Sequence, residues 1–325
     1  MATYKGINGF AVQSVATDPS PLDEGQVWYN NATYAFKLAS VTTAGTWASG
    51  GNLGTGRREL TGTGTQTATL AIGGITTTQV ANTEEYDGTS WAGGGNLATA
   101  RYRLASGGTQ TAAAAFGGII FTTFQNSTEE YNGTSWTGGG NMGTARYGLN
   151  GCGTQTAALA FGGGDPVGSL GVLTEEYDGT SWTSGGAMGT ARYILGSAVL
   201  ATQTAALAFG GNNGTVNVVN TEEYDGTSWT SGGSLITAGS GSLGAGTQTN
   251  ALSMGYGPTN QTTQAYNGTS WSSDTSSSTA NRSDAGGAGS RAAAIMFGGN
   301  PGPGITTTEE YTGPGVPQTK TITTS

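Results

Sequence analysis

Arginines and glutamates that recur at a fixed spacing are the residues of this chain that could carry chemistry. Five arginines each fall 10 or 11 residues after a tryptophan, and adjacent glutamates occur in the same repeating units. An arginine fork binds carboxylates and other anions, so these residues predict either structural ion pairs or an anion-binding ring. The candidate set is Arg57, Arg101, Arg146, Arg192 and Arg282 with Glu85, Glu130, Glu176, Glu223 and Glu310.

Repetition of this set favours the ion pairs. Acids placed for hydrolysis need two distinct environments, whereas the ten repeated glutamates are equivalent. The fifth unit has Gly239 in place of the arginine, and Gln264 with Ala265 in place of the glutamates. Because both departures fall in one unit, we interpret each arginine as bonding a glutamate of its own unit, such as Glu176 for Arg146. An anion site similar to the arginine clusters of sialidases is the weaker interpretation.

Other catalytic and metal-binding chemistry finds little support in the residue types. The chain has no histidine, on which imidazole-ligated copper centres and most serine or cysteine nucleophiles depend. Asp165 lacks the spaced acidic loop of a calcium site, and the single cysteine, Cys152, allows no internal disulfide. We therefore expect a non-enzymatic protein with no metal and no cofactor.

Composition indicates sheets and disfavours several partners. Only 10% of the residues are charged and 60 are glycine, so burial relies on sheets and small side chains. The net charge of -9 repels phosphate backbones, which disfavours nucleic acid as a partner. No apolar stretch has the length of a signal-peptide core or a membrane span, so neither Sec-type export nor membrane insertion is expected.

An internal repeat of about 45 residues organises most of the chain. Its tryptophans follow one another at steps of 44, 45, 46, 47 and 42 residues and are Trp47, Trp91, Trp136, Trp182, Trp229 and Trp271. Each unit contains a strand after the arginine, an apolar strand ending in Gly-Gly, a strand with the glutamates and a tyrosine, and a strand at the tryptophan. Four strands per unit form one blade of a β-propeller.

This pattern resembles the kelch motif of galactose-oxidase-type propellers. The Gly-Gly pairs that carry the resemblance begin at Gly73, Gly117, Gly162, Gly210 and Gly298. The resemblance implies an all-β fold, a six-bladed kelch-like β-propeller. Because Trp47 precedes the first arginine strand and the last unit stops after Tyr311, we expect the N-terminal strand to complete the C-terminal blade. The expected domains are an N-terminal extension or hairpin at 1–45, the propeller at 46–312 and a C-terminal tail at 313–325.

The segment before the repeats is similar to segments of bacteriophage tail-fibre and other virion proteins. It reads Glu24-Gly-Gln-Val-Trp-Tyr-Asn30, and the aromatic strand Thr33 to Leu38 follows after a short turn. This resemblance implies a virion protein, assembled in the host cytoplasm, that attaches to other virion proteins through this segment and binds a host-surface glycan or protein. A protein-binding kelch module is the alternative, and a galactose-oxidase-like or sialidase-like enzyme is a weaker one.

The connections between the second and third strands differ most from unit to unit. In a propeller they all emerge on one face, which is therefore the predicted binding surface. Aromatic rings there could stack on a sugar, and amide or carboxylate groups could bond its hydroxyls. The candidate ligand-binding residues are Phe121, Phe124, Asp165, Asn212 and Asn213. The alternative is that these connections diverged because nothing constrains them.

Overall fold

The computed structural model describes residues 12–19, 26–41, 44–165, 171–256, 260–274, 282–315 and 317–322. The chain divides into two units, one formed by Thr46–Thr312 and the other by Met1–Gly45 with Gly313–Ser325. Every regular element within the described ranges is a β-strand. In the same ranges no helix has the length and apolar character to cross a membrane.

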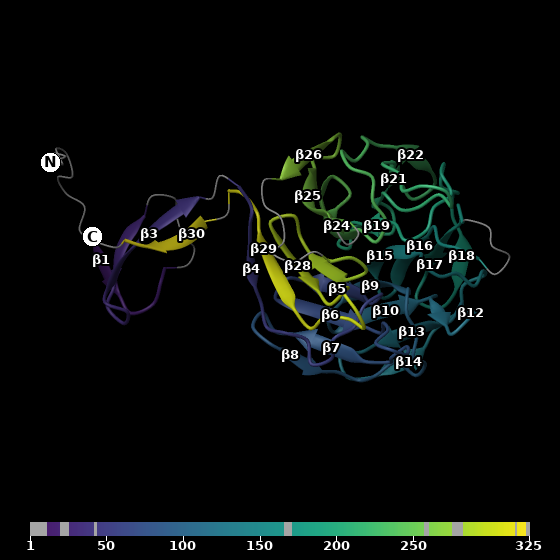
Figure 1. The fold of residues 1–325 in the computed structure, drawn as a ribbon, viewed down its shortest axis with the longest axis horizontal. Helices are drawn as coiled ribbons and strands as arrows, with labels where there is room; N and C mark the ends of the chain where they lie inside the picture. The colour runs from purple at the N-terminus through teal and green to yellow at the C-terminus, as the bar shows by residue number, and fades with distance from the viewer. Residues whose placement is uncertain are drawn as a thin grey trace. The chain divides into compact units, whose positions relative to one another are not determined.

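Thr46–Thr312 is a six-bladed β-propeller, as the repeat predicts, with six four-stranded antiparallel sheets arranged around a ring (Figure 1). Blades 1 and 2 contain β5 (Thr61–Thr65), β6 (Ala68–Ile72), β7 (Thr83–Tyr86) and β8 (Trp91–Gly93), then β9 (Ala105–Thr109), β10 (Ala112–Phe116), β13 (Thr128–Tyr131) and β14 (Trp136–Gly138). Blades 3 and 4 contain β15 (Asn150–Thr154), β16 (Ala157–Phe161), β17 (Thr174–Tyr177) and β18 (Trp182–Ser184), then β19 (Gly196–Ser197), β20 (Ala206–Phe209), β21 (Thr221–Tyr224) and β22 (Trp229–Ser231).

Blades 5 and 6 complete the ring. They contain β23 (Leu243–Thr247), β24 (Asn250–Tyr256), β25 (Asn260–Tyr266) and β26 (Trp271–Asp274), then β27 (Gly286–Gly289), β28 (Ala293–Phe297), β29 (Thr308–Thr312) and β4 (Thr46–Ser49). In the last blade Trp47 lies opposite Tyr311, with ring centroids 5.2 Å apart. The predicted closure by the N-terminal strand is therefore confirmed, and it removes two exposed sheet edges.

The first strand of each blade lies nearest the middle of the ring, beside the first strands of both neighbouring blades. Glycine is required there because the backbones approach closely. A Cβ atom on Gly244 would lie 1.7 Å from the carbonyl oxygen of Ser197, and one on Gly107 would lie 2.7 Å from that of Cys152. These contacts keep the middle of the propeller narrow.

The second strand of each blade is buried on both faces, which explains its continuous apolar sequence. In β10, for example, the residues from Ala113 to Phe116 are all fully buried. Phe116 extends to the next blade and packs edge-on against Trp182, at a centroid distance of 4.8 Å. The hydrophobic core therefore runs between the blades as well as within them.

The second unit is a four-stranded sheet in the order β1-β2-β3-β30. Its strands are β1 (Gln13–Val15), β2 (Val27–Asn30), β3 (Ala35–Val41) and β30 (Pro317–Thr321). β2 and β3 form the expected hairpin, β1 runs parallel to β2, and β30 pairs with β3. The N-terminal extension and the C-terminal tail, expected as separate segments, thus share one sheet.

Candidate functional site

Each repeated arginine is fully buried and bonds a carboxylate of its own blade. Arg146 donates from Nη2 to Glu175 Oε1 at 2.9 Å, and from Nη1 to the carbonyl oxygen of Gly162 at 2.8 Å. Gly162 opens the Gly-Gly pair of that blade, so the arginine lies across these glycines as predicted. Burial lowers the pKa of Arg146, and the charge of Glu175 opposes that shift. The equivalent pairs are Arg57–Glu84, Arg101–Glu129, Arg192–Glu222 and Arg282–Glu309.

The partner is the first glutamate of each pair and not the second, so the predicted pairing of Arg146 with Glu176 is wrong by one residue. Successive side chains of a strand point to opposite faces, and the second glutamate therefore faces a neighbouring blade. There Glu176 accepts a hydrogen bond from Tyr224 Oη at 2.6 Å. The same correction applies to Glu85, Glu130, Glu223 and Glu310, which accept from Tyr131, Tyr177, Tyr266 and Tyr86.

Blade 5 keeps the hydrogen-bond pattern of this pair without its charges. In blade 3, Glu175 also accepts the backbone N–H of Gly143 at 2.6 Å. In blade 5, Gln264 Oε1 accepts the equivalent N–H of Ile236 at 2.7 Å, and Gly239 stands where the arginine would be. A neutral amide thus replaces the carboxylate where the cation is missing, which confirms the coupling inferred from the sequence.

Six residues at one repeat position form a collar around the middle of the ring. Each lies two residues after the repeated arginine of its blade, or after Gly239 in blade 5. The collar consists of Glu59, Arg103, Gly148, Ile194, Gly241 and Asp284. All six have a left-handed backbone, with φ between 50° and 69°. We call the contact between two neighbouring blades a seam. At five of the six seams the N–H of one collar residue donates to the carbonyl of the preceding one, as from Arg103 to Glu59 at 2.9 Å.

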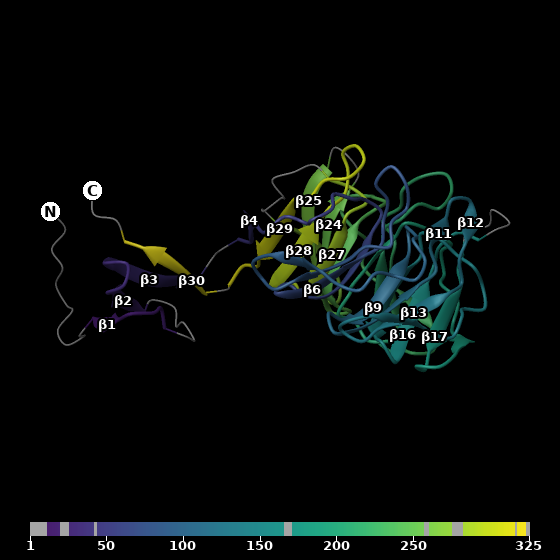
Figure 2. The same cartoon turned by 90° about the horizontal axis from the view of Figure 1, so that it is seen from below.

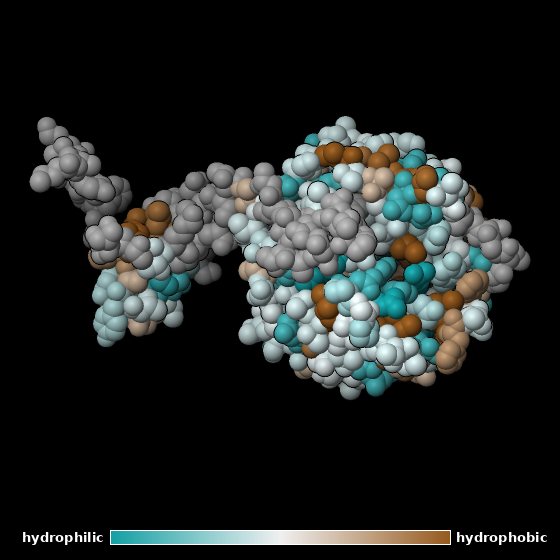
Figure 3. Space-filling model, in the orientation of Figure 1, coloured by the Kyte–Doolittle hydropathy of each residue, from teal (hydrophilic) through white to brown (hydrophobic). Residues whose placement is uncertain are grey.

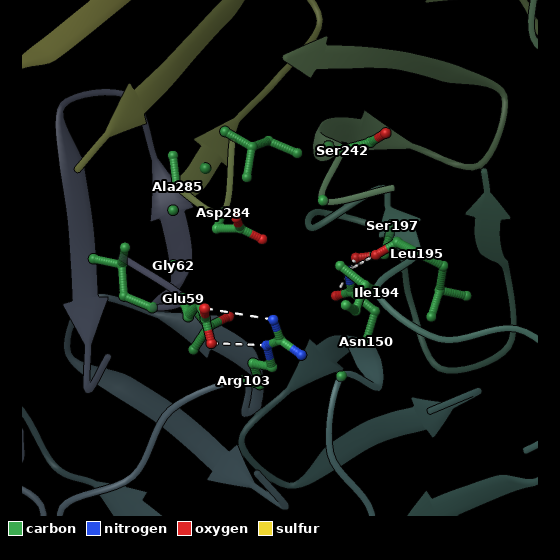
Figure 4. A pocket seen from close by; sticks show the side chains of 18 of the residues that line it. Glu59, Gly62, Arg103, Asn150, Ile194, Leu195, Ser197, Ser242, Asp284 and Ala285 are labelled. Atoms are coloured by element: carbon green, nitrogen blue, oxygen red, sulfur yellow. Dashed lines mark hydrogen bonds and ion pairs between the residues drawn. The ribbon is translucent and has the colours of Figure 1, made fainter. Parts of the chain in front are cut away.

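The collar surrounds a pocket of about 100 Å³ to which all six blades contribute residues; we call it the axial pocket (Figure 4). Arg103 and Asp284 both extend into it. Arg103 Nε donates to Glu59 Oε2 at 2.7 Å, and Arg58 Nη1 binds the other oxygen of Glu59 at 2.5 Å. Asp284 Oδ2 accepts from Asn300 Nδ2 at 2.8 Å. The pocket therefore presents groups of both charges.

The collar breaks the symmetry of the propeller. Its backbone is the same in every blade, but its side chains are acidic, basic, apolar or absent. Glycine adopts a left-handed backbone freely, whereas other residues there cost about 1 to 3 kcal/mol each. Sequence reasoning missed this position. The available signal was a residue of changing charge just after the repeated arginine.

The connection in blade 2 forms a short hairpin of β11 (Ile119–Ile120) and β12 (Thr123–Phe124), which extends beyond the end of the sheet (Figure 2). It carries two of the predicted ligand-binding residues. Phe121, at the tip, is 70% exposed. Phe124 stacks on Tyr147 of the next blade, with ring centroids 4.7 Å apart and planes at 20°. Phe121 is thus accessible, whereas protein covers one face of the Phe124 ring.

The other predicted residues lie in the next two blades. Asp165 is half-buried and follows Gly164, which pairs with Tyr147. Asn212 Nδ2 donates to Asn217 Oδ1 at 2.9 Å, and Asn213 Oδ1 accepts the N–H of Val216 at 2.9 Å. Both asparagines therefore stabilise their own turn, although Asn213 is exposed.

The axial pocket and these connections share one face of the propeller. First strands begin, and second strands end, at the same end of each antiparallel sheet. We call this side the loop face. The view in Figure 3 shows hydrophilic residues near the middle of the propeller with a small hydrophobic area among them. Polar groups beside aromatic rings suit the binding of a polar ligand.

No known protein-family model matches the chain, and no curated protein is significantly similar to it. Across the described ranges, no three histidine, cysteine, aspartate or glutamate side chains gather in a way that could hold a metal ion.

Proposed function

We propose that this protein is a non-enzymatic bacteriophage virion protein, a tail fibre or similar appendage, whose loop face binds a host-surface ligand such as a glycan. One observation carries the proposal. The contacts that build the blades repeat around the ring, whereas the collar and the second-to-third-strand connections, which differ between blades, share the loop face. A constant framework with one variable face is typical of binding proteins.

The positions of the repeated acids support binding over hydrolysis. In the blades that have the Glu-Glu pair, the first glutamate bonds an arginine and the second accepts a tyrosine hydroxyl, as Glu175 and Glu176 do in blade 3. Glu59, at the axial pocket, is bonded by two arginines. A general acid or base needs an environment that tunes its proton affinity to the reaction, and these carboxylates are engaged in packing the sheets.

We also propose that the propeller is kelch-like. The motif's residues have defined structural roles here. A carbonyl of the Gly-Gly pair accepts a hydrogen bond from the arginine, and the tyrosine and the tryptophan each donate a hydrogen bond to the preceding blade. A kelch-like propeller also suits the alternative function, a protein-binding module, in which the loop face would bind a protein.

The smaller unit supports attachment to other virion proteins. Nine large hydrophobic side chains are exposed among the described residues, and five of these belong to this unit: Val12, Val27, Tyr34, Phe36 and Ile322. Val27, Tyr29 and Phe36 share one face of the β2–β3 hairpin, since Tyr29 lies opposite Phe36 and two residues from Val27. Exposed apolar residues on one sheet face mark a surface that a partner covers.

The test of ligand binding is a glycan array and a host-cell binding assay with the full chain. Asp165→Ala and Asn212→Ala should weaken binding, because both residues lie on the loop face. The matched control is Thr134→Ala, in the exposed hairpin between β13 and β14 at the opposite end of blade 2. Absence of binding by the wild type, or loss of binding only in Thr134→Ala, would refute the proposal.

The test of virion attachment is incorporation into phage particles. Deletion of residues 1–45 should abolish incorporation and leave ligand binding unchanged. Normal incorporation of the shortened chain would favour a protein-binding module over a virion appendage.

A further inference from the structure

We propose that the axial pocket binds the acid group of a sugar acid, with Arg103 holding the carboxylate and Asp284 bonding ring hydroxyls. This inference rests on the proposed function and names the ligand class that the loop face recognises.

Beside the axial pocket, two partly exposed arginines bond the same carboxylate, that of Glu59. Of the eight arginines in Thr46–Thr312, which has no lysine, five belong to the buried pairs. Arg58 and Arg103 are 29% and 30% exposed, and both bond Glu59, which is only 7% exposed. Arg58 and Arg103 offset the charges of Glu59 and of Asp284, the neighbouring collar residue, so the positive charge is local to the Arg103 guanidinium. On a chain of net charge -9, this is a favourable position for an acid.

Arg103 is held ready for a ligand. Its Nε and Nη2 donate to the carboxylate of Glu59 at 2.7 and 3.4 Å. Its guanidinium carbon lies 6.0 Å from the centroid of the Tyr147 ring. These contacts fix the plane of the guanidinium and leave Nη1 free to donate. A pre-oriented guanidinium binds a carboxylate with little further loss of side-chain entropy.

Unsatisfied polar groups gather at the seam between blades 5 and 6. The N–H of Asp284 makes no bond to Gly241, although the five equivalent collar bonds are present. Both hydrogen bonds to Asp284 from neighbouring side chains, Ser283 and Asn300, go to Oδ2, so Oδ1 can accept from a ligand. A sugar hydroxyl can donate to Oδ1 and accept from this N–H.

The size of the pocket selects the tip of a ligand and not a whole sugar. A volume of about 100 Å³ equals the share of about three water molecules in the liquid, enough for a carboxylate and its carbon. The Cβ that Gly148 lacks would lie 3.8 Å from Tyr193 Cδ2. That Cβ would also lie 3.2 Å from Ile194 Cγ1, so the missing side chain leaves room in the collar beside Ile194.

The experiment compares acid sugars with their neutral methyl esters by titration calorimetry on the full chain. The probes are a galacturonic acid trimer and sialyllactose, each beside its ester. We expect at least one acid to bind about tenfold or more tightly than its ester, because a charge-assisted hydrogen bond is lost on esterification. Equal affinity for both acids and their esters would overturn the proposal.

Substitutions within the collar supply matched variants. Gly148 and Gly241 stand at the equivalent position of two blades, so Arg103→Gly and Asp284→Gly should keep the collar backbone intact, which thermal unfolding verifies. Arg103→Gly should abolish the preference for the acid, and Asp284→Gly should weaken binding of acid and ester alike. Thr134→Ala, at the opposite end of blade 2, should bind as the wild type does. A preference that survives Arg103→Gly refutes the assignment.

Host-cell binding by the same variants separates this inference from the proposed function. If the wild type binds host cells but prefers neither acid to its ester, the pocket assignment is wrong and the proposed function stands. If an acid is preferred through Arg103 but no host cell is bound, the pocket assignment stands and the proposed function is wrong.

Discussion

At the scale of single residues, the repeated charges are buried and paired within each blade. Arg146 bonds Glu175 and two backbone carbonyls, and Glu175 also accepts a loop N–H. Such pairs add little net stability, because burying two charges costs about as much as their attraction returns. Removing one partner is different, since it leaves the other charge buried alone.

Arg146→Ala should therefore lower the free energy of unfolding by about 3 to 5 kcal/mol. Adding Glu175→Gln should recover part of this loss, because Gln264 fills the same position in blade 5 without an arginine. Urea unfolding of the wild type, both single variants and the double variant measures the coupling. If the double variant lost as much free energy of unfolding as the two single variants lose together, the expected coupling would be contradicted.

The free energy of unfolding should fall steeply between pH 10 and pH 12. In five tyrosines, burial and a hydrogen bond to a carboxylate of the preceding blade raise the pKa from 10.0 to about 12. They are Tyr86, Tyr131, Tyr177, Tyr224 and Tyr266. Because the folded state holds these protons more tightly, the stabilisation is complete below pH 10 and is lost as the pH rises through 12.

Urea unfolding at intervals from pH 8 to pH 12 measures this dependence. Tyr224→Phe should make the decline shallower, since it removes one of the linked protons. The matched control is Tyr34→Phe, at an 82% exposed tyrosine of the other unit, which should leave the decline unchanged. Equal slopes in Tyr224→Phe and the wild type would argue against the linkage.

At the scale of structural elements, two side chains join most neighbouring blades. The glutamine between the first and second strands donates to two carbonyls of the preceding blade, as Gln155 Nε2 does to Tyr131 at 2.7 Å. The tryptophan of the fourth strand donates to a threonine, as Trp182 Nε1 does to Thr128 Oγ1 at 2.9 Å. These bonds repeat because the residues that make them repeat.

The seam between blades 5 and 6 lacks both of these bonds. Arg291 replaces the glutamine and donates to the side chain of Asn250 at 3.0 Å, and Trp47 Nε1 has no partner. A hydrogen bond from Tyr311 compensates in part. At the other seams the equivalent tyrosine donates to a glutamate, but Ala265 stands at that position in blade 5, and the Tyr311 hydroxyl donates to Asp274 instead, at 2.6 Å. Among the described residues, this seam therefore lacks three of the hydrogen bonds that recur at the other seams: those of the glutamine, the tryptophan and the collar.

Arg291→Gln should raise the free energy of unfolding by about 1 kcal/mol, because the glutamine can donate to backbone carbonyls of blade 5 as it does at the other seams. The reverse change, Gln155→Arg in blade 3, should lower it by about 1 to 3 kcal/mol by leaving two carbonyls without a donor. Urea unfolding of the two variants gives both values. Destabilisation by Arg291→Gln would be evidence against the role assigned to this glutamine.

At the scale of the whole propeller, one short strand closes the ring. β4 supplies the outer strand of blade 6, and its pairing with β29 joins residues that are more than 250 positions apart in the chain. Without β4, an edge of β29 would present unpaired N–H and C=O groups that recruit other chains.

Deletion of residues 1–50 should therefore produce aggregates, whereas deletion of residues 1–45, which keeps β4, should not. Light scattering after size-exclusion chromatography distinguishes the two proteins. Aggregate-free protein lacking residues 1–50 would show that blade 6 is stable without its outer strand.

The sequence by itself determined the number of blades, the four strands in each and the strand that closes the ring. These follow from the period of the repeat and from the position of Trp47 before the first complete unit. It also determined that the arginine and a glutamate are coupled, because Gly239 and Gln264 depart from the repeat together. These features can be predicted from the sequence because each depends on the spacing of residues within a repeat or on the order of the repeats.

Only the tertiary structure decided which glutamate binds the arginine and where the variable groups converge. Glu175 and Glu176 are adjacent and identical in type, but alternation along the strand gives them opposite faces, and the packing of the blades determines which face meets Arg146. Arg103 and Asp284 lie far apart in the sequence and line one pocket because the ring closes. No local pattern encodes that convergence, since it depends on backbone bonds between blades.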